Sequence, residues 1–151
     1  MRTLTLIAAG LVVTGALSSG CTCNNGDIGD WFGTWHLEKI QTDGNDIADY
    51  QGNIFWQFQS DVINMTELTL GGYHERSNHW GTWKEQKNTL SLNFNHPINP
   101  GVTTPSSEFE PPSILHLPLE ADLAIDKFSS SRLIVTYNAT DATYKYILKK
   151  Q

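Results

Sequence analysis

Residues 53–70 read NIFWQFQSDVINMTELTL, and this stretch decides the fold class. Ile54, Trp56 and Phe58 occupy every second position, which places the three large side chains on one face of an extended strand. A turn at Ser60-Asp61 then reverses the chain, and the residues that follow it again favour a strand. The pattern predicts an antiparallel β-hairpin with one apolar face that must be buried.

The same alternation repeats on both sides of this hairpin, broken by turn residues. It predicts an all-β, antiparallel, up-and-down eight-stranded barrel, because such a row of hairpins can close on itself and bury its apolar face. A two-sheet β-sandwich is the alternative, since alternation alone does not prove closure. The predicted strands cover 35–41, 53–59, 62–70, 79–85, 89–95, 132–137 and 143–149, with a weaker strand over 113–117 and a short helix or irregular strand over 120–127.

A short motif occurs twice, as WFGTW over 31–35 and HWGTW over 79–83. Glycine lets two backbones approach closely, and the tryptophan that follows can cap a barrel end. We therefore expect both copies to meet the same structural need on two strands.

The N-terminus has the layout of a secretory signal peptide over residues 1–20: Arg2, an apolar run, and small residues before Cys21. The sequence LSSGC over 17–21 resembles a bacterial lipobox. That resemblance implies that Cys21 carries a diacylglyceryl group and becomes the first residue of the mature chain. Residues 21–30 are then a lipidated flexible tether, and 31–151 form the barrel domain. An ordinary secreted protein with unmodified cysteines is the alternative.

The net charge of the chain after Cys21 and the predicted lipid anchor indicate which partners the protein has and where it is located. Of ten basic residues one, Arg2, precedes Cys21, which leaves nine against sixteen acidic residues and a formal charge of −7 after it. This balance argues against nucleic-acid binding, which needs clustered Lys and Arg. The predicted partners are the membrane, through the lipid anchor, and a small apolar ligand. We expect the chain in the cell envelope, most simply on the outer membrane facing the periplasm.

Gly33-Thr34-Trp35 resembles the Gly-x-Trp signature of lipocalins, and the order of motifs is similar to small lipocalin-like lipoproteins of Bacteroidetes-type bacteria. The other motifs are Asn-Thr-Leu-x-Leu over 88–92 and the closing pair RLIVTY and YKYILKK. The resemblance implies a barrel whose tryptophan closes the floor. Lipocalins usually place an arginine over that tryptophan, and here only Lys149 and Lys150 can stand in for it.

Catalytic and metal motifs are not evident in the sequence, so we expect a protein that is not an enzyme and holds no cofactor. His74 and His79 flank Glu75 in a glycine-rich stretch, but their spacing matches no established metal motif. Cys23 lies in the tether and is interpreted as a free thiol.

Two functional hypotheses remain: a membrane-tethered binder of a small apolar or amphipathic molecule, and a ligand-free structural or interaction subunit of an envelope complex. The proline-rich segment 96–113 is either a lid with Phe109 at its tip or a disordered loop. If the barrel holds a ligand, the predicted lining comprises Trp56, Phe58, Trp83, Tyr137 and Tyr146; the alternative is that these residues are core.

Overall fold

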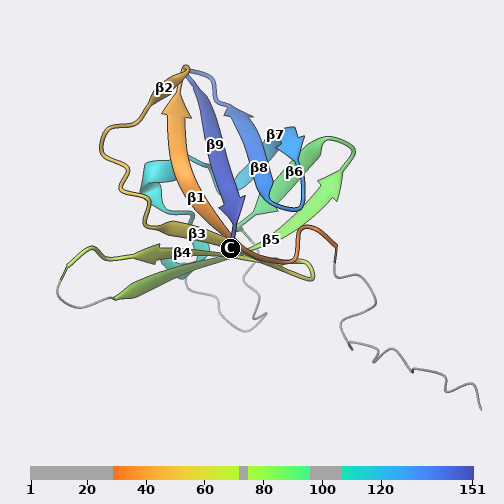
Figure 1. Ribbon diagram of the computed structural model, residues 1–151, viewed down its shortest axis with the longest axis horizontal. Helices are drawn as coiled ribbons and strands as arrows, with labels where there is room; N and C mark the ends of the chain where they lie inside the picture. The colour runs from red at the N-terminus through yellow and green to blue at the C-terminus, as the bar shows by residue number, and fades with distance from the viewer. Residues whose placement is uncertain (1–28, 72–74, 96–106) are drawn as a thin grey trace, which may run out of the picture.

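The computed structural model describes residues 29–71, 75–95 and 107–151, and they form one closed β-barrel (Figure 1). Every neighbouring pair of strands is antiparallel, and β1 also pairs with β9, which closes the sheet. Eight long strands make the barrel, and the two-residue β2 pairs antiparallel with the end of β1. The strands are β1 (Gly33–Thr42), β2 (Asn45–Asp46), β3 (Ile54–Gln59), β4 (Val62–Leu68), β5 (Arg76–Gln86), β6 (Thr89–Asn93), β7 (Glu120–Phe128), β8 (Arg132–Asn138) and β9 (Thr143–Lys150).

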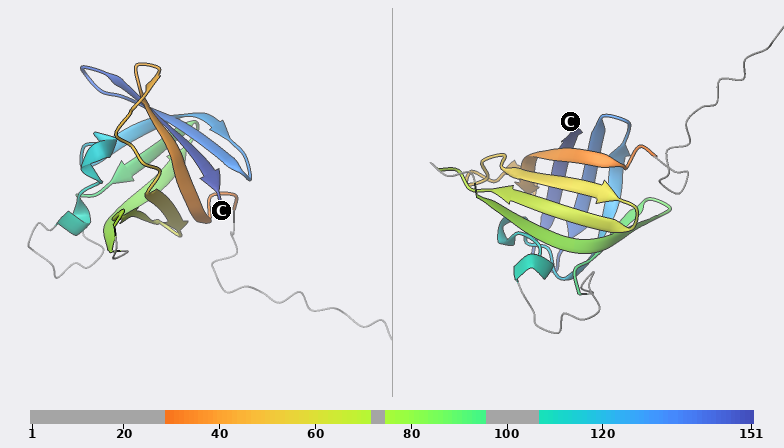
Figure 2. Two further views of the ribbon diagram at one scale, coloured as in Figure 1. Left: turned by 60° about the vertical axis from the view of Figure 1, so that its left-hand side comes forward. Right: turned by 90° about the horizontal axis from the view of Figure 1, so that it is seen from below.

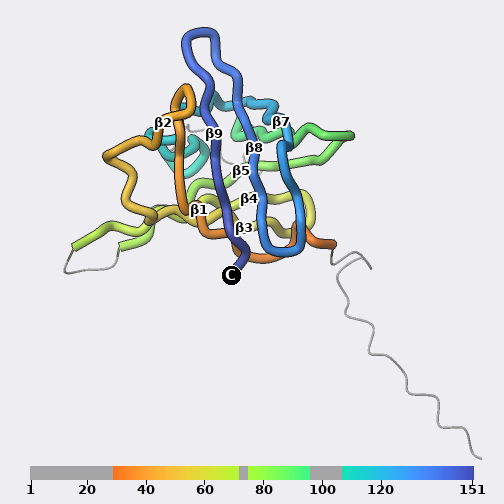
Figure 3. Tube along the Cα trace, turned by 45° about the horizontal axis from the view of Figure 1, so that its top comes forward, coloured from red at the N-terminus to blue at the C-terminus, as the bar shows by residue number. Residues whose placement is uncertain are grey.

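Closure confirms the predicted barrel and excludes the sandwich, because the first and last long strands pair over seven positions. The two halves of the barrel cross at a steep angle: β1, β3, β4 and β5 pass across β7, β8 and β9 (Figure 2, right). The tube in Figure 3 shows the same order of strands around the barrel. Such crossing is what strand tilt and twist produce when a small barrel closes.

One element differs from the sequence prediction, and another decides between two alternatives that the sequence left open. The predicted strand over 113–117 is wrong: this segment contains a short 3-10 helix, η2 (Ser113–Leu115). Pro112 precedes it without a backbone donor, and His116 ends it in the left-handed conformation, which no strand can continue. The ambiguous segment at 120–127 is the strand β7, with a register shift between Ile125 and Lys127.

The hairpin turns need unusual backbone angles. Asp43 and Gly44 both have positive φ, 50° and 85°, as a two-residue turn between twisted strands requires. Ser60 and Lys87 also have positive φ, at the turns before β4 and β6. The turn predicted at Ser60-Asp61 is therefore present where β3 ends and β4 begins.

Inward-facing side chains fill the barrel. Trp35, Trp56 and Tyr146 are the largest fully buried side chains of the described residues, and all belong to one continuous core cluster. Each fully buried large apolar side chain contributes about 1.5–3 kcal/mol to folding. The stability of the domain therefore depends on this filled interior.

The end of the barrel near Trp31, here called the floor, is closed by aromatic rings. Trp31 stacks on Phe128 with ring centroids 4.3 Å apart and contacts Phe58 and Trp83 at 5.1 and 5.2 Å. The Nε1–H of Trp35 donates to the carbonyl oxygen of Trp31 at 3.0 Å. These contacts connect the chain before β1 to the barrel and exclude water from this end.

Both copies of the Gly-Thr-Trp motif contribute a tryptophan to this floor, and each copy needs its glycine for a different reason. Gly33 has φ of 119°, which side chains rarely permit. A Cβ at Gly81 would lie 2.9 Å from the carbonyl oxygen of Asn93 and from the Phe94 ring. The predicted close approach of a neighbouring strand to the glycine backbone is therefore confirmed at Gly81. Lys150 places Nζ 5.2 Å from the centre of a Trp35 ring and thus occupies the position expected for the missing arginine.

The opposite end, here called the mouth, is closed by the segment 112–117. Leu115 is fully buried, and its carbonyl oxygen accepts a hydrogen bond from the Tyr146 hydroxyl. His116 stacks on Tyr144 with centroids 5.0 Å apart. The apolar residue that enters the barrel from this segment is therefore Leu115, whereas the predicted tip Phe109 is only half-buried.

Candidate functional site at the barrel mouth

Two adjoining hollows lie at the mouth. The first has a volume of about 420 Å³ and combines an apolar wall of Leu68, Leu70 and Ile114 with a polar wall that includes Glu67. The second, of about 410 Å³, follows β5 and the 3-10 helix η1 (Ser107–Phe109). Glu67 and Ser77 line both hollows, so the two adjoin, and together they are here called the rim groove.

Strand register brings the two central side chains together. Glu67 pairs with Ser77, and Met65 pairs with His79 across the β4–β5 ladder. Residues at this parity point inward along both strands, so Glu67 and His79 are diagonal neighbours on the inner face. The groove thus receives an acidic side chain from the last inward position of β4 and an imidazole side chain from β5, one inward position further into the barrel than Ser77.

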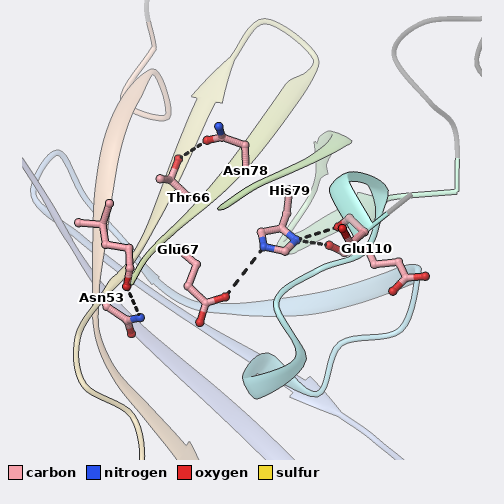
Figure 4. Close-up of polar contacts among 8 residues, drawn as sticks. Asn53, Thr66, Glu67, Asn78, His79 and Glu110 are labelled. Atoms are coloured by element: carbon pink, nitrogen blue, oxygen red, sulfur yellow. Dashed lines mark hydrogen bonds and ion pairs between the residues drawn. The ribbon is translucent and has the colours of Figure 1, made fainter. Parts of the chain in front are cut away.

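A buried polar network on the outer face of the same strands fixes their spacing. Thr66 Oγ1 donates to Asn78 Oδ1 at 3.0 Å, and Asn64 Nδ2 lies 3.2 Å from the same oxygen. On the neighbouring loop, Asn53 Nδ2 donates to the Leu68 carbonyl oxygen at 2.8 Å (Figure 4). These bonds hold the ends of β4 and β5 rigidly beneath the groove, because buried hydrogen-bonded polar groups are costly to separate.

The imidazole of His79 lies between β5 and the segment that contains η1 (Figure 4). Its Nδ1 contacts two carbonyl oxygens, that of Ser107 at 3.1 Å and that of Glu110 at 2.6 Å. Carbonyl oxygens only accept hydrogen bonds, so Nδ1 carries the proton and donates. In the neutral ring Nε2 is then an acceptor, and it is buried without a hydrogen-bond partner among the described residues.

Charge around the groove is mainly negative. Asp49, Glu67 and Glu108 line it, against one cation, Arg76. Glu67 Oε2 lies 4.0 Å from His79 Nε2, and the Glu67 side chain is 38% exposed. The groove therefore presents hydrogen-bond acceptors and negative charge beside an apolar wall.

The ligand-lining residues expected from the sequence lie in the interior instead. Trp56, Phe58 and Tyr146 are fully buried, and Trp56 and Tyr146 contact each other with centroids 5.7 Å apart. Trp83 packs on Phe58 at 4.9 Å and belongs to the floor, and Tyr137 packs against the core at the mouth end of β8. These five residues do not line the two hollows of the rim groove.

Sequence reasoning did not single out Glu67 as a binding residue and considered His79 only for a metal site, although a signal for both residues exists. Ile63, Met65 and Glu67 share one parity on β4, so Glu67 is a charged residue at an inward position. His79 has the inward parity on β5. A polar residue in an otherwise apolar alternation is thus the pattern that marks the groove.

The sequence also raised a metal site at His74, Glu75 and His79. His74 lies outside the described residues. Within the described ranges, no group of three or more His, Cys, Asp or Glu side chains is placed to hold a metal ion.

A third hollow, of about 510 Å³, lies outside the barrel near the β5–β6 turn. It is lined by Gln86, Lys87, Thr89, Ser91 and Asp122, and Ser91 Oγ already donates to Asp122 at 2.6 Å. Its lining has no apolar residue among the described residues and its central pair is satisfied, whereas the rim groove combines leucine and isoleucine side chains with polar ones, so the rim groove is the better candidate site despite its smaller volume.

A closed up-and-down barrel with a tryptophan-sealed floor, a cation over the floor tryptophan and a groove at its mouth defines a lipocalin-like β-barrel. The chain belongs to the family described as the lipocalin-like domain, which it matches over residues 16–147. Among curated proteins, none matches the chain.

Two solved structures share the fold. A lipocalin-like protein from Bacteroides uniformis is 18% identical, with a TM-score of 0.60, covering 82% of this chain and 100% of its own. An uncharacterized protein from Bacteroides eggerthii is 16% identical, with a TM-score of 0.55, covering 80% of this chain and 99% of its own. At these identities the similarity establishes the fold alone.

Within residues 29–71, 75–95 and 107–151, no helix is long and apolar enough to cross a bilayer. The predicted signal peptide, Cys21 and Cys23 lie outside the described residues, as does most of the proline-rich segment 96–113, for which a lid and a disordered loop were the alternatives.

Proposed function

We propose that this protein is a lipid-anchored binding protein of the cell envelope that holds a small amphipathic molecule in the rim groove. The observation that carries the proposal is the first hollow, about 420 Å³, with an apolar wall and a polar wall side by side at the barrel mouth. That volume lies within the range of small-molecule sites. A binding role rather than a catalytic one agrees with the lipocalin-like fold.

The apolar wall supports the amphipathic part of this proposal. Leu70 is 58% exposed, although large apolar side chains in a small domain are usually covered. Leu68 and Ile114 line the same wall, and Ile114 adjoins the buried Leu115. Covering this wall with the hydrocarbon part of a ligand removes apolar surface from water, at about 25 cal/mol per Å². The filled interior need not open.

The experiment is native mass spectrometry of the chain purified from its own envelope, combined with a groove-blocking variant. Ser77 is exposed and lines both hollows, so Ser77→Trp fills the groove without disturbing a buried side chain. Ser130→Trp makes the same change at an exposed turn at the floor end. We expect a bound small molecule in the wild type and in Ser130→Trp, and its loss in Ser77→Trp. An unliganded mass in all three refutes the proposed function.

The anchor is tested separately. Cys21→Ser removes the thiol that the lipobox resemblance assigns to diacylglycerol, and stable anchoring needs at least two acyl chains. We expect the variant to leave the membrane fraction and to lose labelled palmitate. If the wild type incorporates no palmitate, the anchor is wrong, and with it the assignment to the outer membrane facing the periplasm.

The packed interior favours one alternative, a ligand-free barrel that acts as a structural or interaction subunit. Trp56, Phe58 and Tyr146 occupy the space where many barrels of this size hold a ligand. The alternative predicts no ligand in the mass spectrum and equal behaviour of Ser77→Trp and Ser130→Trp in ligand assays. The same experiment therefore separates the two functions.

A further inference from the structure

We propose that Glu67 and His79 form a subsite for a protonated primary amine, so that the ligand of the rim groove has an ammonium head. This inference rests on the proposed function, because the head is placed in the same groove. It begins from one unexplained atom. His79 is only 9% exposed, and its Nε2 is buried without a partner among the described residues. Leaving a buried polar atom unpaired costs about 1–3 kcal/mol, so a partner is expected there.

The partner must be a hydrogen-bond donor. Nδ1 is fixed as the donor by the carbonyl oxygens of Ser107 and Glu110, which leaves Nε2 as an acceptor in the neutral ring. The nearest charged atom is Glu67 Oε2, 4.0 Å away, and a carboxylate is also an acceptor. With the His79 ring neutral, two acceptors face each other with no donor between them, so in that state the pair is complementary to a group that donates twice.

The separation favours an ammonium over a metal ion. The two acceptor atoms lie 4.0 Å apart. A nitrogen placed about 2.8 Å from each of them makes an acceptor–nitrogen–acceptor angle of about 90°. Two N–H bonds of an ammonium can point to both acceptors at this angle with little bending of the hydrogen bonds. A tetrahedral zinc ion, with bonds of about 2.0–2.1 Å, holds its ligand atoms about 3.4 Å apart. Glu67 is part-exposed, so a rotation of its side chain admits the head between the two acceptors.

Charge favours a cation over a neutral hydroxyl. The groove has three carboxylates, from Asp49, Glu67 and Glu108, against Arg76 as its cation. Hydrogen bonds in which one partner is charged are roughly twice as strong as neutral ones. The apolar wall at Leu68 and Leu70 adjoins Glu67, so a hydrocarbon chain attached to the ammonium reaches that wall directly.

The test uses three probes that differ only in their head: hexylamine, hexanol and hexanoate. They are titrated at neutral pH into the full chain carrying Cys21→Ser, so that no acyl chain of the protein competes. We expect hexylamine to bind about tenfold or more tighter than hexanol, as a charge-assisted pair provides, and hexanoate to bind weakest. Equal affinity for hexylamine and hexanol, or a preference for hexanoate, overturns the ammonium subsite and leaves the proposed function standing. If no probe binds and the native mass spectrum is unliganded, both fail.

A matched pair of variants locates the head. Glu67→Gln keeps the shape and removes the charge, and Asp61→Asn removes one charge from the exposed turn at the other end of β4. We expect hexylamine binding to fall about tenfold in Glu67→Gln only, with hexanol binding unchanged in both. An equal fall in both variants means that the effect is general electrostatic attraction and overturns the subsite.

A nitrogen-15 NMR spectrum of the wild-type protein with labelled histidine measures the chemical shifts of both His79 ring nitrogens. This measurement does not require any variant to fold. We expect Nε2 of His79 to have the shift of an acceptor nitrogen and to move on addition of hexylamine, while Nδ1 stays protonated. A His79 signal that hexylamine leaves unchanged overturns the role of this residue.

Discussion

The two ends of the barrel are closed in different ways. At the floor, Trp31, Trp35 and Phe128 pack ring against ring, and Lys150 lies over Trp35. At the mouth, one short segment inserts Leu115, and polar side chains surround it. The floor joins elements distant in sequence through large apolar contacts, whereas the mouth leaves acceptors unpaired. The comparison indicates that the floor supplies stability, which lets the mouth keep a costly polar site for binding.

The largest expected effect is at the floor. Trp35→Ala removes a fully buried indole together with its hydrogen bond to the Trp31 carbonyl oxygen and its contact with the Lys150 cation. We expect the free energy of unfolding to fall by about 3–5 kcal/mol, measured by urea denaturation followed by circular dichroism. A loss below 1 kcal/mol would show that the floor is not the main source of stability.

Leu115→Ala makes the corresponding change at the mouth. Leu115 is fully buried, but it comes from a three-residue helix and not from a strand. We expect a loss of about 2–3 kcal/mol, at the low end for a buried leucine, because a short segment relaxes into the space more easily. Hexanol binding should rise, since the change opens room beside Ile114. If Leu115→Ala costs more than Trp35→Ala, the contrast between the ends is reversed.

Alkaline pH distinguishes the ends through their phenols. Burial raises the pKa of Tyr146 and of Tyr50 well above the ordinary value of 10.0, and both lie toward the mouth. Well below pH 10 both phenols are neutral in the folded and the unfolded chain. Above pH 10 the unfolded chain ionises first, so stability is lost as pH rises, at up to about 1.4 kcal/mol per pH unit for each phenol.

Tyr146→Phe provides the check on that slope. This variant also loses the hydrogen bond to the Leu115 carbonyl oxygen, so it starts from a lower stability. Between pH 10 and 11 its free energy of unfolding should nevertheless fall less steeply than that of the wild type, because one phenol fewer ionises on unfolding. Urea midpoints measured across this range give the two slopes, and parallel slopes would contradict the burial of this phenol.

How much the sequence predicts differs between the ends as well. The strands and the floor follow from local patterns: Ile54, Trp56 and Phe58 show their face by alternation, and both Gly-Thr-Trp copies mark the floor. Closure between β1 and β9 is a long-range pairing, which alternation within single strands cannot distinguish from a sandwich.

The rim groove was harder to foresee. His79 binds carbonyl oxygens of residues 28 and 31 positions later, through a segment whose only local signals were prolines. Pro111 and Pro112 correctly indicated irregular backbone among the described residues, but the isolated apolar residues of 113–117 were mistaken for a strand. Glu67 was visible as a charge at an inward position, and only the register with β5 brings it to His79.

The smallest expected effect tests the cation over the floor. Lys150 Nζ lies 5.2 Å from the centre of a Trp35 ring and donates to the Asp30 carbonyl oxygen at 2.6 Å. Lys150→Met keeps the aliphatic stem and removes the charge, so we expect a loss of about 0.5–1 kcal/mol, the usual size of a part-exposed cation–π contact. Lys149→Met makes the same substitution on the neighbouring exposed residue, which has the opposite parity on β9 and points away from Trp35. Urea denaturation should show the loss for Lys150→Met alone; an equal loss in both would mean that overall charge, and not the tryptophan beneath Lys150, is responsible.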